Sequence, residues 1–168
     1  SLINQFDSEI YTGKDYIADE RRLKRMLNYY ISYKYRDGIL DSLMEKFFNE
    51  EALFRDFYLS KNDIKKLVLN GNVIGSHTVT HRVLSRLSFQ EQYKEIKTSF
   101  DFIDSIVIQD YKSFCYPYGY RSSYNADTLE VLDCLRVDDA CLFDNKIQHS
   151  IPKKYELSRI DCNQFLEV

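Results

Sequence analysis

The sequence has few of the residues and patterns that mark linkers, membrane spans or basic binding surfaces. It contains no Trp, two Pro and five Gly in 168 residues, which leaves little room for flexible linkers or low-complexity segments. No apolar run approaches the roughly 18 residues of a membrane span, and no signal peptide is visible. A formal charge of −3 gives no reason to expect a nucleic acid or an anionic membrane surface as partner. We therefore expect one globular domain with a buried core.

Cysteine motifs are also missing. The four cysteines show no CxxC pair and no regular spacing, and Cys115, Cys134 and Cys141 lie among apolar residues, where free cysteine behaves as a small hydrophobe. We expect reduced thiols and a cytoplasmic location. Because the chain begins at Ser1 without Met, an upstream segment would allow an envelope location instead.

The pattern of apolar residues predicts helices first, then strands that alternate with helices. Helical spacing runs through residues 15–35 and 37–58. Ser60, with Asp63 three residues later, is predicted to begin the next helix, and Ser88 and Glu91 form a capping box at another. The later elements are predicted helices at 59–71, 87–106 and 125–136, and predicted strands at 73–74, 112–119, 138–143 and 156–161. The alternation predicts an α/β fold with a parallel sheet or barrel.

Two of the three histidines, His77 and His81, lie four residues apart in "GSHTVTH", just after the strand predicted at 73–74. Such a pair can bind one ion if the loop turns into a helix there, and neutral imidazole is a common ligand of zinc and similar ions. The spacing alone leaves capping, turn or surface histidines as the alternative. Thr78 stands where the HExxH motif has glutamate, which argues against a zincin protease.

Three sequence segments, taken in order, resemble one family. The run "LVLNGNVIGSHTVTHRVLSRLSFQEQYKEI" resembles the second motif region of the polysaccharide deacetylases, the NodB-like family of carbohydrate esterases. Downstream, "SFCYPYG" resembles the third motif in its "YPYG" form, and "ELSRID" resembles a Leu-x-Arg-Ile-Asp segment of relatives with that form. The resemblance covers roughly residues 58–162. It implies a single domain over 1–168 with a distorted (β/α) barrel, incomplete at its N-terminus: 1–58 is a helical insertion-like segment and 59–168 the motif-bearing α/β part.

The resemblance also implies a site. Family members remove N- or O-acetyl groups from glycans with one divalent metal ion, held by an Asp and two His. Here it implies His77 and His81 as ligands of one ion, Zn²⁺ with Co²⁺ or Ni²⁺ as alternatives, and an N-acetylated sugar or polysaccharide as substrate. Tyr118 corresponds to the residue whose backbone N–H stabilises the oxyanion, and Pro117 and Gly119 shape the same substrate-binding turn. A plain tight turn is the alternative role of "YPYG".

The sequence departs from the family pattern at the acidic and late-histidine positions. The first motif, a strand ending in "TFDDG" that supplies the general base and the third metal ligand, has no match. Asp7, in "QFDSE", is the nearest candidate ligand, without the second Asp and the Gly. Arg159 is a candidate catalytic residue in "LSRI", where a histidine is usual, and His149 is the remaining candidate general acid. A strand-end contact for Arg159 and a surface position for His149 are the alternatives.

Two functions from different classes are consistent with these residues. The first is a metal-dependent hydrolase that removes N-acetyl groups from a sugar or polysaccharide in cell-envelope or surface-polysaccharide metabolism, with the Asp pair encoded before Ser1. The second is a non-catalytic glycan-binding or interaction module on a decayed deacetylase scaffold. The missing aspartates motivate the second function, and 14 Tyr would suit stacking on sugar rings. A helical docking surface at 15–58 rests only on amphipathic spacing.

Overall fold

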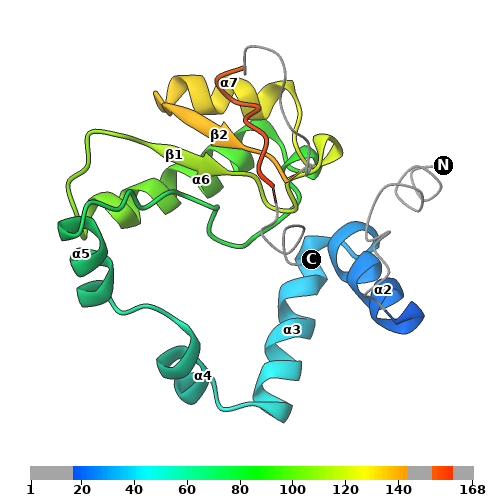
Figure 1. Cartoon of the computed structure of the whole chain (residues 1–168). Helices are drawn as coiled ribbons and strands as arrows, with labels where there is room; N and C mark the ends of the chain where they lie inside the picture. The colour runs from blue at the N-terminus through cyan, green and yellow to red at the C-terminus, as the bar shows by residue number, and fades with distance from the viewer. Residues whose placement is uncertain (1–16, 144–152, 161–168) are drawn as a thin grey trace, which may run out of the picture. The chain divides into compact units, whose positions relative to one another are not determined.

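The computed structural model describes residues 17–143 and 153–160, so Asp7 and His149 lie outside the described residues. The chain forms two compact units, Ser1–Tyr58 and Leu59–Val168 (Figure 1).

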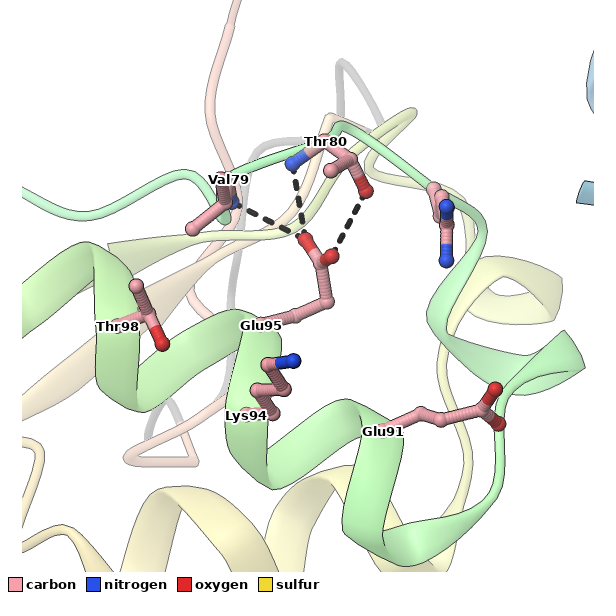
Figure 2. A pocket seen from close by; sticks show the side chains of 7 residues that line it. Val79, Thr80, Glu91, Lys94, Glu95 and Thr98 are labelled. Carbon is pink, nitrogen blue, oxygen red and sulfur yellow. Dashed lines mark hydrogen bonds between the residues drawn. The ribbon is translucent and has the colours of Figure 1, made fainter. Parts of the chain in front are cut away.

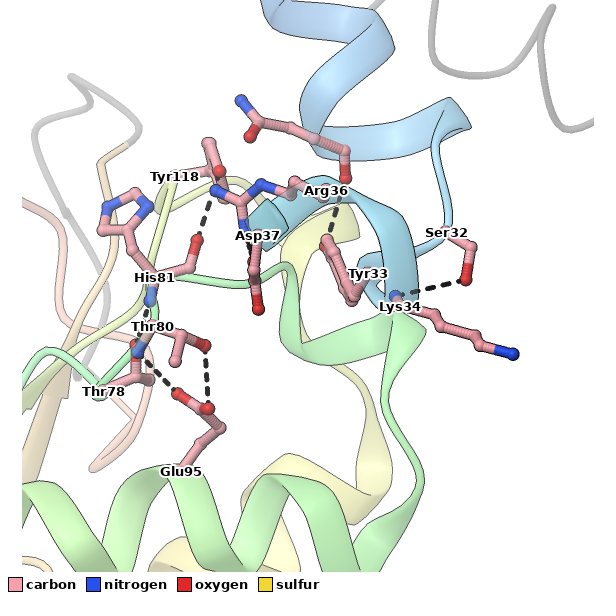
Figure 3. Close-up of polar contacts among 11 residues, drawn as sticks. Ser32, Tyr33, Lys34, Arg36, Asp37, Thr78, Thr80, His81, Glu95 and Tyr118 are labelled. Carbon is pink, nitrogen blue, oxygen red and sulfur yellow. Dashed lines mark hydrogen bonds and ion pairs between the residues drawn. The ribbon is translucent and has the colours of Figure 1, made fainter. Parts of the chain in front are cut away.

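The first unit is helical, as the apolar spacing predicts. α2 (Ala18–Arg25) runs into a π-helical turn, η1 (Met26–Tyr30), and is followed by α3 (Tyr33–Phe47) and α4 (Glu50–Phe57). The Ser32 side chain begins α3 by accepting a hydrogen bond from the Lys34 N–H (Figure 3), and Asn49 begins α4 by accepting from the Ala52 N–H. These polar caps separate helices that the apolar spacing alone does not divide.

The helices predicted in the second unit are confirmed. In α5 (Lys61–Leu69), Ser60 and Asp63 form a complete capping box, and Ser88 and Glu91 do the same in α6 (Phe89–Asp104). α7 (Ala126–Cys134) begins at Asn125, whose side chain accepts from the Thr128 N–H at 3.1 Å. In each case the side chains satisfy N–H groups that have no partner within the helix.

Four segments of the second unit lie side by side in chain order. β1 (Ser113–Cys115) and β2 (Asp139–Cys141) pair in parallel, with Cys115 opposite Cys141. Ser76 makes a parallel bridge to β1, and Leu157 makes one to β2 on the other side (Figure 1). The strand prediction at 73–74 is therefore wrong in position, because the residue that pairs is Ser76. Within the described residues, the strand predicted at 156–161 is a single bridge.

The barrel that the resemblance implies is not observed in residues 17–143 and 153–160. A barrel requires a sheet in which every strand has two neighbours. Here the sheet stays open, with Ser76 and Leu157 as its outer members in the described ranges. The architecture is α/β, with α6 and α7 connecting successive parallel segments. Among the described helices, none has the length and apolar character that a membrane crossing requires.

The core of the second unit joins α6 and α7 to the sheet. α6 packs against α7. Gln92 is buried in this core, where its Nε2 donates to the Leu87 carbonyl and its Oε1 accepts from the Thr128 hydroxyl, so its amide is satisfied. The fully buried apolar side chains include Ile96, Phe114, Val131, Leu132, Val137 and Leu142. One face of α6 is therefore fixed in the core.

Glu156 precedes the Leu157 bridge and links this segment to η3 (Arg121–Ser123) and to Tyr124. Its side chain is 13% exposed, and it accepts from the Tyr124 hydroxyl at 2.8 Å and pairs with Arg121 at 3.1 Å and Lys153 at 3.2 Å. Burial alone would raise the pKa of this carboxyl, but the three donors outweigh burial and hold the pKa below its ordinary value of 4.5.

We expect Glu156→Gln to lower the free energy of unfolding at pH 7 by about 1–3 kcal/mol, because charge-assisted hydrogen bonds are lost. A lowered carboxyl pKa contributes stability that is present above the unfolded-state pKa and is lost as the pH falls through the folded-state pKa. The difference between the two proteins should therefore shrink below about pH 4.5. Urea denaturation from pH 7 to pH 3 measures this, with Glu130→Gln on α7 as the charge-matched control. An equal difference at all pH values would contradict the assignment.

Candidate active site

The site is built at one end of the parallel segments. The Ser76 N–H donates to the Ser113 carbonyl and the Cys115 N–H donates to the Ser76 carbonyl, both at 2.9 Å. This pairing sets His77 directly beyond the bridge and brings it beside the end of β1. The "YPYG" turn follows β1 at the same end. Carboxyl ends of parallel strands are where α/β folds place binding sites, and the sequence motifs converge there.

One hydrogen bond fixes the protonation pattern of His77. Its Nδ1 lies 2.7 Å from the carbonyl oxygen of Cys115. A carbonyl can only accept, so Nδ1 carries the proton and Nε2 keeps its lone pair in the neutral ring. Metal-binding histidines typically have this arrangement, in which the second ring nitrogen donates to a backbone carbonyl or carboxylate. The His77 side chain is exposed, so the ring that carries Nε2 faces solvent.

The loop 77–81 does not form the helical turn by which two histidines four residues apart would meet one ion. Thr78 and His81 both have left-handed backbone, with φ of 66° and 52°. The Thr78 hydroxyl accepts from the His81 N–H at 3.2 Å, and the Tyr118 hydroxyl donates to the His81 carbonyl at 3.2 Å (Figure 3). A non-glycine residue with positive φ is uncommon and needs support from its surroundings. The tertiary contacts of this loop supply that support.

The structure brings together three residues that the sequence indicates. The rings of His77 and His81 have centroids 4.8 Å apart, and those of His81 and Tyr118 are also 4.8 Å apart, both in edge-to-face orientation. His81 thus lies between His77 and Tyr118. This small area can therefore offer a ligand both an imidazole, which can act as an acid or a base, and the aromatic ring of Tyr118.

The turn after β1 is tightly held. Pro117 and Gly119 are buried, Tyr118 is half-buried, and Tyr118 and Gly119 have φ of 66° and 68°. The Gly119 carbonyl accepts from the Phe143 N–H at 2.9 Å. A Cβ at Gly119 would lie only 2.4 Å from the Cβ of Phe143, so this position accepts no side chain without movement.

Arg159 lies at the neighbouring strand ends. Its Nε donates to the Leu142 carbonyl at 2.9 Å, just beyond β2. Burial raises the pKa of the Cys115 thiol, and the positive charge of Arg159 acts in the opposite direction. The contacts found within the described residues include none between Arg159 and the histidine pair. Asp7 and His149, the other two predicted residues, lie outside the described ranges.

The two imidazoles fit part of a zinc site. Zn²⁺ accepts neutral imidazole nitrogen, and the tautomer of His77 leaves Nε2 for such a bond. Across residues 17–143 and 153–160, no cluster of three His, Cys, Asp or Glu side chains could hold a metal ion. Within these ranges His77 and His81 are candidate imidazole donors without a third such side chain beside them.

Glu95 is a further residue of the site that the sequence did not indicate. This side chain rises from α6 to the loop, and its carboxylate accepts from the Val79 N–H at 3.1 Å, the Thr80 N–H at 2.9 Å and the Thr80 hydroxyl at 2.8 Å (Figure 2). It lines a hollow of about 360 Å³ between the loop and the helix, together with Arg82, Glu91, Lys94 and Thr98. No pattern in the sequence separates Glu95 from the other charged residues of α6, because the contact spans about 15 residues.

Comparisons with known proteins agree with this arrangement. Residues 39–138, more than half of the chain, match the sequence model of the polysaccharide deacetylase family. Among solved structures, the chain is similar to the Streptococcus pyogenes deacetylase PplD in complex with acetate, with a TM-score of 0.56 and 27% sequence identity. That match covers 61% of this chain and 44% of the streptococcal protein, so the chain spans less than half the length of that deacetylase. A search of curated proteins found no match. The match to the family model, which includes both the histidine loop and the "YPYG" turn, shows that this chain belongs to the polysaccharide deacetylase family.

Proposed function

We propose that this chain carries the histidine-bearing part of a metal-dependent carbohydrate N-deacetylase. The reaction is hydrolysis of an acetamido group on a sugar or polysaccharide to an amine and acetate, in cell-envelope or surface-polysaccharide metabolism. Family membership supports the reaction class, and the similar streptococcal structure is a deacetylase in complex with acetate, the product that this reaction would release.

The observation that carries the proposal is the state of His77 and its place beside His81 and Tyr118. The Nδ1–H bond to the Cys115 carbonyl orients the ring and leaves Nε2 as a donor toward a cation. The adjacent ring of His81 is close enough for the two side chains to serve one ion. A surface histidine pair without function would not need a strand carbonyl to set its tautomer.

Each residue of the site has its own role in the proposed reaction. His77 and His81 would hold a divalent ion, Zn²⁺ with Co²⁺ or Ni²⁺ as alternatives, with a carboxylate from outside the described ranges. When bound, such an ion polarises the acetyl carbonyl and lowers the pKa of a water molecule. The turn of Pro117, Tyr118 and Gly119 would position the sugar, and the backbone N–H of Tyr118 would stabilise negative charge on the acetyl oxygen. Arg159 would contribute positive charge at the neighbouring strand ends.

Metal removal tests this function. We expect protein that includes any sequence encoded before Ser1 to release acetate from N-acetylated oligosaccharides, to lose this activity on chelation, and to regain it with Zn²⁺, Co²⁺ or Ni²⁺. Circular dichroism of the chelated protein shows whether it stays folded. Acetate release that continues at the same rate after complete chelation would refute the metal-dependent mechanism.

The second candidate function is a non-catalytic glycan-binding module. It is favoured by one observation, that the described residues hold two candidate ligands and no third acidic one. This function predicts binding of the same oligosaccharides without acetate release and without bound metal. Metal content measured by mass spectrometry on the purified protein, together with calorimetric titration of the oligosaccharide, distinguishes the two functions.

A further inference from the structure

We propose that Glu95 is the positioning residue of the metal-binding loop, an inference that rests on the proposed role of His77 and His81. Glu95 touches neither histidine side chain in the contacts described. It acts through the backbone of Val79 and Thr80, the residues between the two histidines. Its role would be to hold the loop in the one conformation that brings both imidazoles to the same side.

The geometry is that of a carboxylate binding a backbone site. The N–H groups of Val79 and Thr80 are consecutive, and both donate to the same oxygen, Oε2, while the Thr80 hydroxyl donates to Oε1. Consecutive N–H groups beside a left-handed residue, here Thr78, form a concave site that favours an anion. Each oxygen of Glu95 is thereby engaged with the loop (Figure 2).

The loop needs such an anchor because two of its residues, Thr78 and His81, have left-handed backbone. It follows the Ser76 bridge and precedes η2 (Leu84–Arg86), and both His77 and His81 are exposed. Left-handed backbone at a non-glycine residue is strained, and it persists only where the surroundings impose the conformation. Glu95 connects the middle of this loop to α6.

Helix α6 is a rigid support for this carboxylate. Ile96, the next residue, is fully buried, and Phe100 is buried one turn later. Glu91, one turn before Glu95 on the same side, has a different task, because its carboxylate accepts from the N–H and hydroxyl of Ser88 and completes the helix cap. The helix therefore needs Glu91 for its own start, whereas Glu95 makes its described hydrogen bonds to the loop.

The test compares three replacements of Glu95. Glu95→Ala removes the acceptor, and Glu95→Asp keeps the charge but shortens the reach by one methylene. Glu95→Gln keeps one oxygen for the two backbone N–H groups and presents its NH₂ to the Thr80 hydroxyl, which can accept. Asp101→Asn is the matched control, because it removes an acid on the same helix that pairs with Lys97 and not with the loop.

Two measurements are made on each protein. In metal-free protein, hydrogen exchange of the Val79 and Thr80 amides should be at least about tenfold faster in the Ala and Asp variants than in the parent, less so in the Gln variant. Competitive titration with Zn²⁺ should show affinity lowered by about tenfold or more for Ala and Asp, with partial rescue by Gln. The Asp101→Asn control should match the parent in both measurements.

The outcomes separate this inference from the proposed function. If Zn²⁺ affinity depends on His77 and His81 but Glu95→Ala behaves like Asp101→Asn in both measurements, the positioning role is refuted and the metal site stands. If no Zn²⁺ affinity depends on the histidines, the proposed function fails, and amide exchange alone then decides whether Glu95 holds the loop. Where Zn²⁺ affinity does depend on the histidines, faster exchange with unchanged Zn²⁺ affinity would overturn the inference, because the loop would be held without benefit to the site.

Discussion

Replacing both His77 and His81 with alanine should lower the affinity of the protein for Zn²⁺ by at least about 100-fold, the upper end of the loss seen when an outer-shell partner of a metal site is replaced. Acetate release should fall below detection for the same reason. Both side chains are exposed, so the free energy of unfolding of metal-free protein should change by no more than about 1 kcal/mol. Competitive Zn²⁺ titration and urea denaturation measure the two quantities.

The third histidine provides the control for this experiment. Replacing His149 with alanine removes one imidazole from the same chain and should leave the Zn²⁺ affinity unchanged. Single replacements of His77 and of His81 should each lose most of the affinity, because two donors to one ion act as a unit. Equal Zn²⁺ binding by the double variant and the parent would show that the ion is held elsewhere, and the proposed site would be wrong.

Replacing Gly119 with alanine should lower the free energy of unfolding by about 3 kcal/mol, the combined cost of a strained left-handed residue and an overpacked contact. The new Cβ would lie 2.4 Å from the Cβ and 2.6 Å from the N of Phe143. Moving the turn away would break the hydrogen bond from the Phe143 N–H to the Gly119 carbonyl. Because Tyr118 precedes Gly119, deacetylation should fall together with stability.

Gly71 allows the cost of left-handed backbone to be measured apart from the cost of the contact with Phe143. It also has positive φ, at 83°, but a Cβ there meets nothing within 4 Å. Gly71→Ala should therefore lose only the backbone part, about 1 kcal/mol. Urea denaturation of both variants at pH 7 gives the difference. If the two variants are equally destabilised, the contact with Phe143 is not what requires glycine at position 119.

Local sequence signals were sufficient for the helices of the second unit. Ser60 with Asp63, and Ser88 with Glu91, form the capping boxes that their spacing predicts, because a cap depends on residues within one turn. The strand at 73–74 was predicted wrongly because strand pairing, unlike a helix cap, depends on residues far away in the sequence. Which residue of an extended segment pairs is decided by the neighbouring strand, and the partner of Phe114 is Ser76.

The sequence by itself determined the family, the order of helices and extended segments, and the two motifs that meet in the site. Motif recognition needs only the residue types and their spacing, and the "HTVTH" and "YPYG" segments preserve both. Only the tertiary structure decided how the histidines are held. The carbonyl that orients His77 belongs to Cys115, 38 residues away, and the carboxylate that holds the loop belongs to Glu95 on α6. Such contacts follow from the packing of α6 and the parallel pairing of Ser76 with β1, and no local pattern of residues encodes them.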